Sequence, residues 1–145
     1  MTYKVLVLLS RKPDTTPEAF KSYYNDHHLP MYRSLVGDLF PLLHTQRYIH
    51  RTASSSSMTT TPSEGTTTRN PTTPATLLRG TQSDVDFDVE VTLEFKDAQA
   101  WQAQLDLLQR PDINAMIVAD EERFLDRGKT VAVLLGEVIE LRAKV

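Results

Sequence analysis

Two adjacent histidines, His27 and His28, lie near the end of a segment with helical spacing, and Pro30 follows them. Histidine is the side chain whose ordinary pKa lies closest to neutral pH, so the pair is a candidate for acid–base catalysis. The alternative is that both side chains only stabilise the C-terminal end of a helix, an effect of about 0.3–1 kcal/mol. From the spacing alone, the stabilising role is the better supported of the two.

A third histidine, His50, lies near the end of one predicted strand, and Asp86 and Asp88 lie near the start of the next. Antiparallel strands joined by a loop place cross-strand neighbours about 4.5–5.5 Å apart, which allows a carboxylate to orient an imidazole. We therefore predict that His50 and Asp88 form an acid–base group and that His28 overhangs the same region. The predicted catalytic residues are thus His28, His50 and Asp88.

Aromatic and cationic residues near these positions are candidates for substrate binding. Tyr24 and Tyr48 offer phenolic donors, and Arg47 or Arg51 offers a cation for a carboxylate or phenolate. Carbonyl or phenol chemistry needs such groups in a pocket with apolar and aromatic walls. The predicted substrate-binding residues are Tyr24, Arg47, Tyr48, Phe20, Trp101 and Phe124.

Each of these groups has a purely structural alternative. The acidic residues that alternate over 86–90 are typical of a solvent-exposed strand face. His44 opens a strand and is expected at the surface, and residues 120–123 fit a charged helix face with ion pairs within the helix. Trp101 and Phe124 suit a hydrophobic core equally well.

The sequence contains no motif for a metal or a cofactor. It has no cysteine, which excludes disulfides, thiolate metal sites and cysteine nucleophiles. Its four histidines include no His-x-x-x-His spacing, and its five glycines form neither a phosphate loop nor a dinucleotide fingerprint. Histidines alone do not define an axial haem ligand. We therefore expect neither a metal nor a cofactor.

Length and composition indicate a single soluble domain. A chain of 145 residues is long enough for one core, and its net charge of −3 argues against a nucleic-acid partner. The chain has no lysine and arginine run, no N-terminal secretion signal and no apolar stretch near the ~20 residues of a membrane helix. We expect a cytoplasmic protein that binds neither nucleic acid nor membrane.

Hydrophobic periodicity predicts the order strand–helix–strand, loop, strand–helix–strand. The first helix is capped at Thr15 or Thr16, ends at Pro30, and is followed by a short helical connection. A later helix begins near Pro111 and ends at Gly128. The predicted strands are Tyr3–Ser10, His44–Arg51, Val85–Phe95 and Thr130–Leu141, and a further helix covers Asp97–Gln109.

This order predicts an α+β, ferredoxin-like fold, with a four-stranded antiparallel sheet and helices on one face. Several strands carry apolar residues on the face that the helices leave open. An uncovered apolar face implies a partner, so we expect a homodimer through the open sheet face.

The segment from Thr52 to Thr76 differs in composition from the rest of the chain. Of its 25 residues, 15 are serine or threonine, with scattered prolines. Such a segment has too little apolar surface to offset the entropy of ordering. We expect a mobile loop, either a lid over a site or an inert surface insertion.

Three parts of the sequence resemble the EthD family of small dimeric α+β barrel proteins. The resemblance covers almost the whole chain, 1–145, as one EthD-like domain, apart from an insertion at 52–80 that the usual family pattern lacks. The matching parts are Arg11-Lys12-Pro13 with Phe20, Tyr24, His28 and Pro30; the strand from Phe87 to Phe95; and the stretch from Ala119 to Asp126.

The resemblance is strongest to the fungal branch found in polyketide pathways. It implies cofactor-independent decarboxylases, dehydratases or cyclases that act on aromatic or polyketide intermediates. It also implies a site between the helices and the sheet of each protomer, with the histidine at position 28 as the functional residue.

The resulting hypothesis is a cofactor-free lyase or cyclase of polyketide metabolism. His28 is expected to act as general acid and base, while His50, Tyr48 and Arg47 position substrate oxygens. A pericyclic or isomerising reaction on the same substrates is the nearest variant. The competing class is a non-catalytic binding or accessory protein that shields a reactive intermediate.

Overall fold

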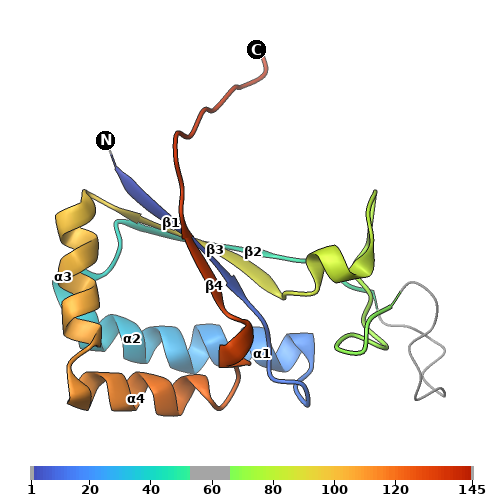
Figure 1. Cartoon of the computed structure of the whole chain (residues 1–145), viewed down its shortest axis with the longest axis horizontal. Helices are drawn as coiled ribbons and strands as arrows, with labels where there is room; N and C mark the ends of the chain where they lie inside the picture. The colour runs from blue at the N-terminus through green and yellow to red at the C-terminus, as the bar shows by residue number, and fades with distance from the viewer. Residues whose placement is uncertain (1, 53–65, 145) are drawn as a thin grey trace.

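A four-stranded antiparallel sheet carries the fold, and the helices α1–α4 lie on one side of it (Figure 1). The computed structural model describes residues 2–52 and 66–144. The strand order across the sheet is β2-β3-β1-β4. This is the ferredoxin-like arrangement that the sequence predicts.

The elements differ in length, and their bounds are as follows. The strands are β1 (Tyr3–Leu9), β2 (Leu43–Tyr48), β3 (Val89–Phe95) and β4 (Val131–Leu134). The α-helices are α1 (Pro17–Tyr23), α2 (Leu29–Val36), α3 (Ala98–Leu108) and α4 (Pro111–Glu121). A π-helical segment covers Tyr24–His28, and 3-10 turns cover Gly37–Leu39, Gln82–Val85 and Arg127–Lys129.

Alternation along the central strands decides which face of the sheet the helices cover. Val91 on β3 is buried opposite Val7 on β1, whereas Glu90 and Glu94 are only partly buried. Since successive strand residues point to opposite faces, the valines face the helices and the glutamates face away. The main core cluster consists of Leu9, Phe20, Tyr24, Val89, Val91, Phe124 and Leu125.

The first helix does not end at Pro30, so that prediction is wrong. α1 runs through the π-helical segment into α2 and reaches Val36. In the π-helical segment the backbone N–H of Leu29 donates to the carbonyl of Tyr24, five residues earlier. Proline lacks an N–H and clashes with a regular preceding turn. The wider turn, with Pro30 in the first turn of α2, removes this conflict.

Other predicted boundaries are shifted by competing local structure. β3 begins at Val89 instead of Val85, because residues 82–85 form a 3-10 turn closed by a capping box. β2 ends at Tyr48, and α4 ends at Glu121, well before Gly128. β4 ends at Leu134, although the N–H of Leu135 still donates to the carbonyl of Lys4. Since β1 begins at Tyr3, no strand is left to pair with residues 137–141.

The face of the sheet away from the helices remains apolar at one edge. Val131 and Val133 of β4 lie opposite Leu8 and Leu6 of β1, and the two valines are half exposed. Beyond β4 the chain extends away from the sheet (Figure 1). The expected homodimer stays a prediction. No helix in the described ranges is both long and apolar enough to cross a membrane.

The expected mobile insertion falls partly on residues 53–65, which lie outside the described residues. Its second part contacts the ends of the central strands through buried polar groups. The Asn70 amide donates to the Asp86 carboxylate at 2.6 Å, and Arg69 forms an ion pair with Asp126 at 3.0 Å. Arg51 and Ala75 form an isolated β-bridge. These contacts hold residues 66–75 against the fold.

Candidate active site

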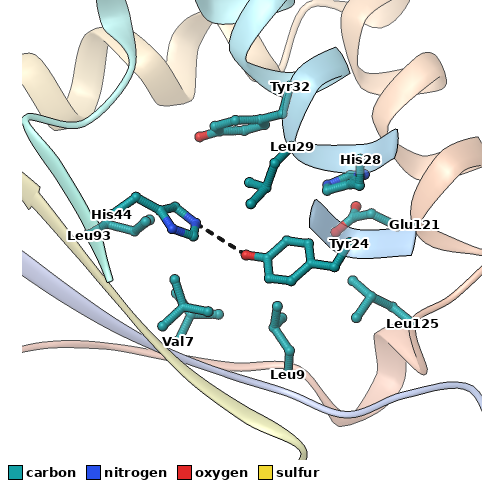
Figure 2. Close-up of a pocket in the computed structure, with 11 residues that line it drawn as sticks. Val7, Leu9, Tyr24, His28, Leu29, Tyr32, His44, Leu93, Glu121 and Leu125 are labelled. Carbon is teal, nitrogen blue, oxygen red and sulfur yellow. Dashed lines mark hydrogen bonds between the residues drawn. The ribbon is translucent and has the colours of Figure 1, made fainter. Parts of the chain in front are cut away.

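A cavity of about 170 Å³ lies between the helices and the sheet. Its floor comes from β1 and β3, and its walls come from the π-helical segment, α2, β2 and the end of α4 (Figure 2). Most of the lining is aliphatic or aromatic, which is typical of small-molecule sites. The lining residues are Val7, Leu9, Tyr24, His28, Leu29, Tyr32, His44, Val91, Leu93, Glu121 and Leu125.

His28 is the best-organised titratable group in this cavity. It is 6% exposed, and its Nδ1 lies 2.8 Å from Oδ2 of Asp120 on α4. The other carboxylate oxygen of Asp120 accepts a hydrogen bond of 2.6 Å from the hydroxyl of Tyr23. The three side chains form a chain of hydrogen bonds that leads from the helix surface to the cavity.

The local fold explains why His28 reaches the cavity while its neighbour does not. Tyr24 and His28 are four residues apart in the π-helical segment, and both are buried. His27 is exposed and stacks on Tyr23, with 5.0 Å between ring centroids. The π turn also carries the chain past Pro30 without a break, so α2 extends the cavity wall.

The carboxylate of Asp120 sets the protonation pattern of His28. Burial acts to raise the pKa of Asp120, but hydrogen bonds from Tyr23 and His28 prevail and lower it, so Asp120 is ionised. An ionised carboxylate only accepts hydrogen bonds, so His28 donates from Nδ1–H. Nε2 is then the basic nitrogen, and it has no hydrogen-bond partner among the described residues. This arrangement is typical of a positioned general base.

A second pair, Tyr24 and His44, lies across the cavity. The Tyr24 hydroxyl is 3.2 Å from Nε2 of His44 (Figure 2). Burial lowers the pKa of His44, which keeps its imidazole neutral, and burial raises the pKa of Tyr24, which keeps its hydroxyl protonated. The hydrogen bond thus joins two neutral groups, and the pair adds a neutral polar contact to the apolar wall.

Glu121 is a carboxyl group whose pKa is shifted in the opposite direction to that of Asp120. It lines the cavity, and burial raises its pKa in spite of nearby His28 and Arg127. The Arg127 guanidinium lies 3.5 Å from its carboxylate. Two adjacent carboxyl groups with pKa values shifted in opposite directions allow different roles. Asp120 holds the imidazole of His28, and Glu121 is the weaker acid of the two.

The sequence model of the EthD domain matches residues 12–128. This chain belongs to the EthD domain family. The match excludes β1 and β4, but it covers the four α-helices and all the polar groups of the cavity. The search of curated proteins gave no match.

Two crystal structures of EthD proteins are similar to this chain. An EthD-like protein from Ralstonia eutropha aligns with a TM-score of 0.52 and 18% identity, covering 98% of this chain and 96% of that one. An EthD family protein from Bacillus halodurans aligns with a TM-score of 0.49 and 15% identity, covering 95% and 100%. At this identity the Ralstonia structure supports the fold of the EthD domain and nothing more specific.

Two of the three predicted catalytic residues lie outside the cavity of this EthD domain. His50 is exposed, and its Nδ1 is 2.7 Å from the hydroxyl of Thr76. Asp88 is buried, but it accepts hydrogen bonds from the backbone and side chain of Arg11. The expected pairing of His50 with Asp88 is absent from the described contacts, because arginines take the carboxylate.

The predicted substrate-binding residues are divided between the cavity, its support and the surface. Tyr24 lines the cavity, and Phe20 and Phe124 pack beneath it in the core. Arg47 is exposed and pairs with Glu90, and the Tyr48 hydroxyl bonds Asn25 and Gln46. Trp101 packs on Tyr3 and Phe95. Arg47, Tyr48 and Trp101 therefore do not line the cavity.

Sequence reasoning placed three polar residues of the cavity region elsewhere, and it did not single out Tyr32, which also lines the cavity. His44 was expected at the surface, and Asp120 and Glu121 were expected on a solvated helix face. Asp120 instead bonds His28, 92 positions earlier, and Glu121 and His44 line the cavity. The signal that was present is the match of residues 119–126 to the EthD pattern.

Asp120→Asn is expected to remove the preference of His28 for the Nδ1–H form, since an amide can donate as well as accept a hydrogen bond. The measurement is the ¹⁵N chemical shifts of His28, which report which ring nitrogen carries the proton. Tyr23→Phe is the matched comparison, since it removes only the outer hydrogen bond and should change these shifts much less. Unchanged His28 shifts in Asp120→Asn would contradict the positioning role.

Glu121→Gln is expected to remove part of the pH dependence of stability. Since burial raises the pKa of Glu121, the native state binds this proton more tightly than the unfolded state. The free energy of unfolding should then fall as pH rises above the ordinary carboxyl value of about 4.3. Thermal unfolding between pH 4 and 8 would show a smaller decline in the variant, whereas exposed Glu122→Gln should behave like wild type.

Proposed function

We propose that this EthD protein is a cytoplasmic, cofactor-independent lyase or cyclase that acts on an aromatic or polyketide intermediate of secondary metabolism. The observation that carries the proposal is the His28–Asp120 pair, which leaves Nε2 of a buried imidazole free at an apolar cavity. His28 acts as the general base and then as the general acid. Acid–base help of this kind is worth about 10²–10⁴-fold in rate.

The reactions in this class share a proton transfer at carbon. Nε2 of His28 removes a proton from the carbon beside a carbonyl, and the electron pair moves to the carbonyl oxygen as an enolate. In dehydration the enolate expels a β-hydroxyl, which leaves as water with a proton from Glu121 or His28. In ring closure the enolate carbon attacks a second carbonyl of the same chain, whose oxygen takes the proton.

Decarboxylation uses the same histidine in the opposite order. Protonated His28 delivers its proton to a ring carbon of an ortho- or para-hydroxy aromatic acid. The carbon–carboxylate bond then breaks, its electron pair restores the aromatic ring, and carbon dioxide leaves. The apolar wall beside His28 favours this loss of charge, since a carboxylate is destabilised where water is excluded.

The size and chemistry of the cavity support an aromatic reacting group. An apolar protein cavity of about 150 Å³ is large enough to bind benzene, and this cavity measures about 170 Å³. Aliphatic side chains of β1 and β3 form its floor, and Tyr24 and Tyr32 form aromatic walls. A single ring therefore fits beside His28.

The test is mass spectrometry of purified protein, without added cofactor, incubated with a panel of aromatic polyketide acids in D₂O. Loss of carbon dioxide or water identifies a lyase, and a new isomer of unchanged mass identifies cyclisation or a pericyclic rearrangement. Deuterium uptake at the carbon beside a carbonyl reports the shared proton transfer even without net turnover. Tight binding with no exchange and no product would overturn the enzyme proposal in favour of a shielding protein.

We also propose that the protein is a homodimer, with the open face of the sheet as the interface. The half-exposed valines of β4 and the leucines of β1 that lie opposite them supply an apolar strip on this face. Sedimentation equilibrium should give the mass of two chains. Val133→Asp places a charge in the strip and should shift the mass toward one chain.

A further inference from the structure

A second hollow adjoins the cavity and has a different chemical character. This outer groove has a volume of about 540 Å³ and is bordered by Asn25, Leu29, Arg33, Phe40, Leu43 and His44, among other residues. Leu29 and His44 also line the inner cavity, so the two spaces share these two side chains as walls. A ligand that passes between them would occupy both.

The volumes indicate that the inner cavity holds only part of a substrate. Sites for drug-sized ligands measure about 300–1,000 Å³, and the inner cavity offers about 170 Å³. A polyketide intermediate with one ring beside His28 must extend further. The outer groove supplies this room, and exposed Leu42 and Leu43 give it an apolar wall.

Arg33 gives the outer groove a positive charge that the protein does not neutralise. It is the only charged side chain among the described residues that border the groove, since half-buried His44 has a lowered pKa and is neutral. Its guanidinium lies over the ring of Phe40, 5.1 Å from the centroid, and Phe40 stacks on His44. No carboxylate in the described parts of the chain forms an ion pair with Arg33.

This position contrasts with the buried arginines at the far end of the sheet. Arg11, Arg51 and Arg69 each lie within ion-pair distance of an aspartate. An arginine whose planar group is held by an aromatic ring, and which has no such partner, is well suited to bind a carboxylate from outside.

We propose that the outer groove binds the carboxylate end of a substrate whose aromatic ring lies beside His28, and that Arg33 determines this specificity. The substrate class is then an extended aryl acid, with ring and carboxylate separated by an apolar chain. The inference rests on the proposed function, because it assumes that the ring occupies the inner cavity.

The experiment compares two probes that differ only in the terminal group, a carboxylate in 6-phenylhexanoate and a neutral hydroxymethyl group in 6-phenyl-1-hexanol. Dissociation constants are measured by calorimetry at low salt, and the ¹⁵N signals of His28 and His44 report whether the ring enters the cavity. Wild type should bind the acid about two- to fivefold more tightly than the alcohol, as for an exposed arginine–carboxylate pair, since Arg33 is exposed. Arg33→Gln should abolish this preference without changing the affinity for the alcohol.

The controls separate charge from position. Arg33→Lys should keep part of the preference, and Arg79→Gln, an equal change of net charge at an exposed site away from the groove, should keep all of it. If the ring shifts the histidine signals but wild type shows no preference, or Arg33→Gln retains one, the inference is overturned and the proposed function stands. If neither probe shifts the His28 signals, the inference and the proposed function are both overturned.

Discussion

Replacing His28 by alanine is expected to reduce turnover by about 10²–10⁴-fold, the contribution of a positioned acid–base group. The variant loses the only imidazole that bonds Asp120 among the described residues, and Asp120 cannot replace it because its carboxylate is ionised and lies behind the ring. The measurement is the rate of product formation, or of deuterium exchange beside the carbonyl, with folding checked by circular dichroism. Ligand affinity should change little, since the apolar walls remain.

His27→Ala is the matched control for this prediction. His27 is the adjacent residue on the same helix, but it is exposed and touches the surface face of Tyr23. Its loss should leave turnover within a few-fold of wild type. Added imidazole should partly restore the rate of His28→Ala by entering the space of the lost ring. A His28→Ala protein as active as His27→Ala would remove His28 from the mechanism.

The fold was largely predictable because its main signals are local. The alternation of β3 and the Asp97 N-cap of α3 each follow from a few neighbouring residues, and the structure confirms both elements. The continuation of the first helix past Pro30 was not predictable from the same rules. A π turn changes the hydrogen-bond pattern around a proline, and no residue type at these positions predicts such a turn.

The candidate site was only partly predictable, for a physical reason. Tyr24 and His28 are close in sequence, so helical spacing placed them together. Asp120 and His44 come close to them only through tertiary packing. Asp120 follows its partner His28 by 92 residues, and His44 follows its partner Tyr24 by 20 residues. A charged residue on a helix has no local property that distinguishes a solvated face from a buried partner.

The expected pair of His50 and Asp88 is absent for a different reason. Strand topology brings the ends of β2 and β3 together, as expected, and the backbone N–H of Ile49 donates to the carbonyl of Asp88. His50 and two arginines, however, compete for the carboxylate of Asp88. Charge-assisted bonds from a guanidinium are stronger than a bond from a neutral imidazole, so Arg11 and Arg51 take the carboxylate.

Asp88→Ala is therefore expected to act on stability, with a loss of about 3–5 kcal/mol in the free energy of unfolding, the usual cost of breaking a buried ion pair. The Asp88 side chain is 3% exposed, and those of Arg11 and Arg51 are each 6% exposed. Its removal leaves two guanidinium groups in the interior without their carboxylate. Urea unfolding of wild type and variant measures the difference.

Glu90→Gln, two positions along the same strand, is the control for Asp88→Ala. Its partner Arg47 is 62% exposed, and such surface pairs contribute about 0–1 kcal/mol. Domains are stable by about 5–15 kcal/mol, so Asp88→Ala can remove much of the total. Activity is therefore compared per folded molecule, where it should match wild type. Near-normal stability with lost activity would instead support the catalytic role for Asp88 that the sequence predicts.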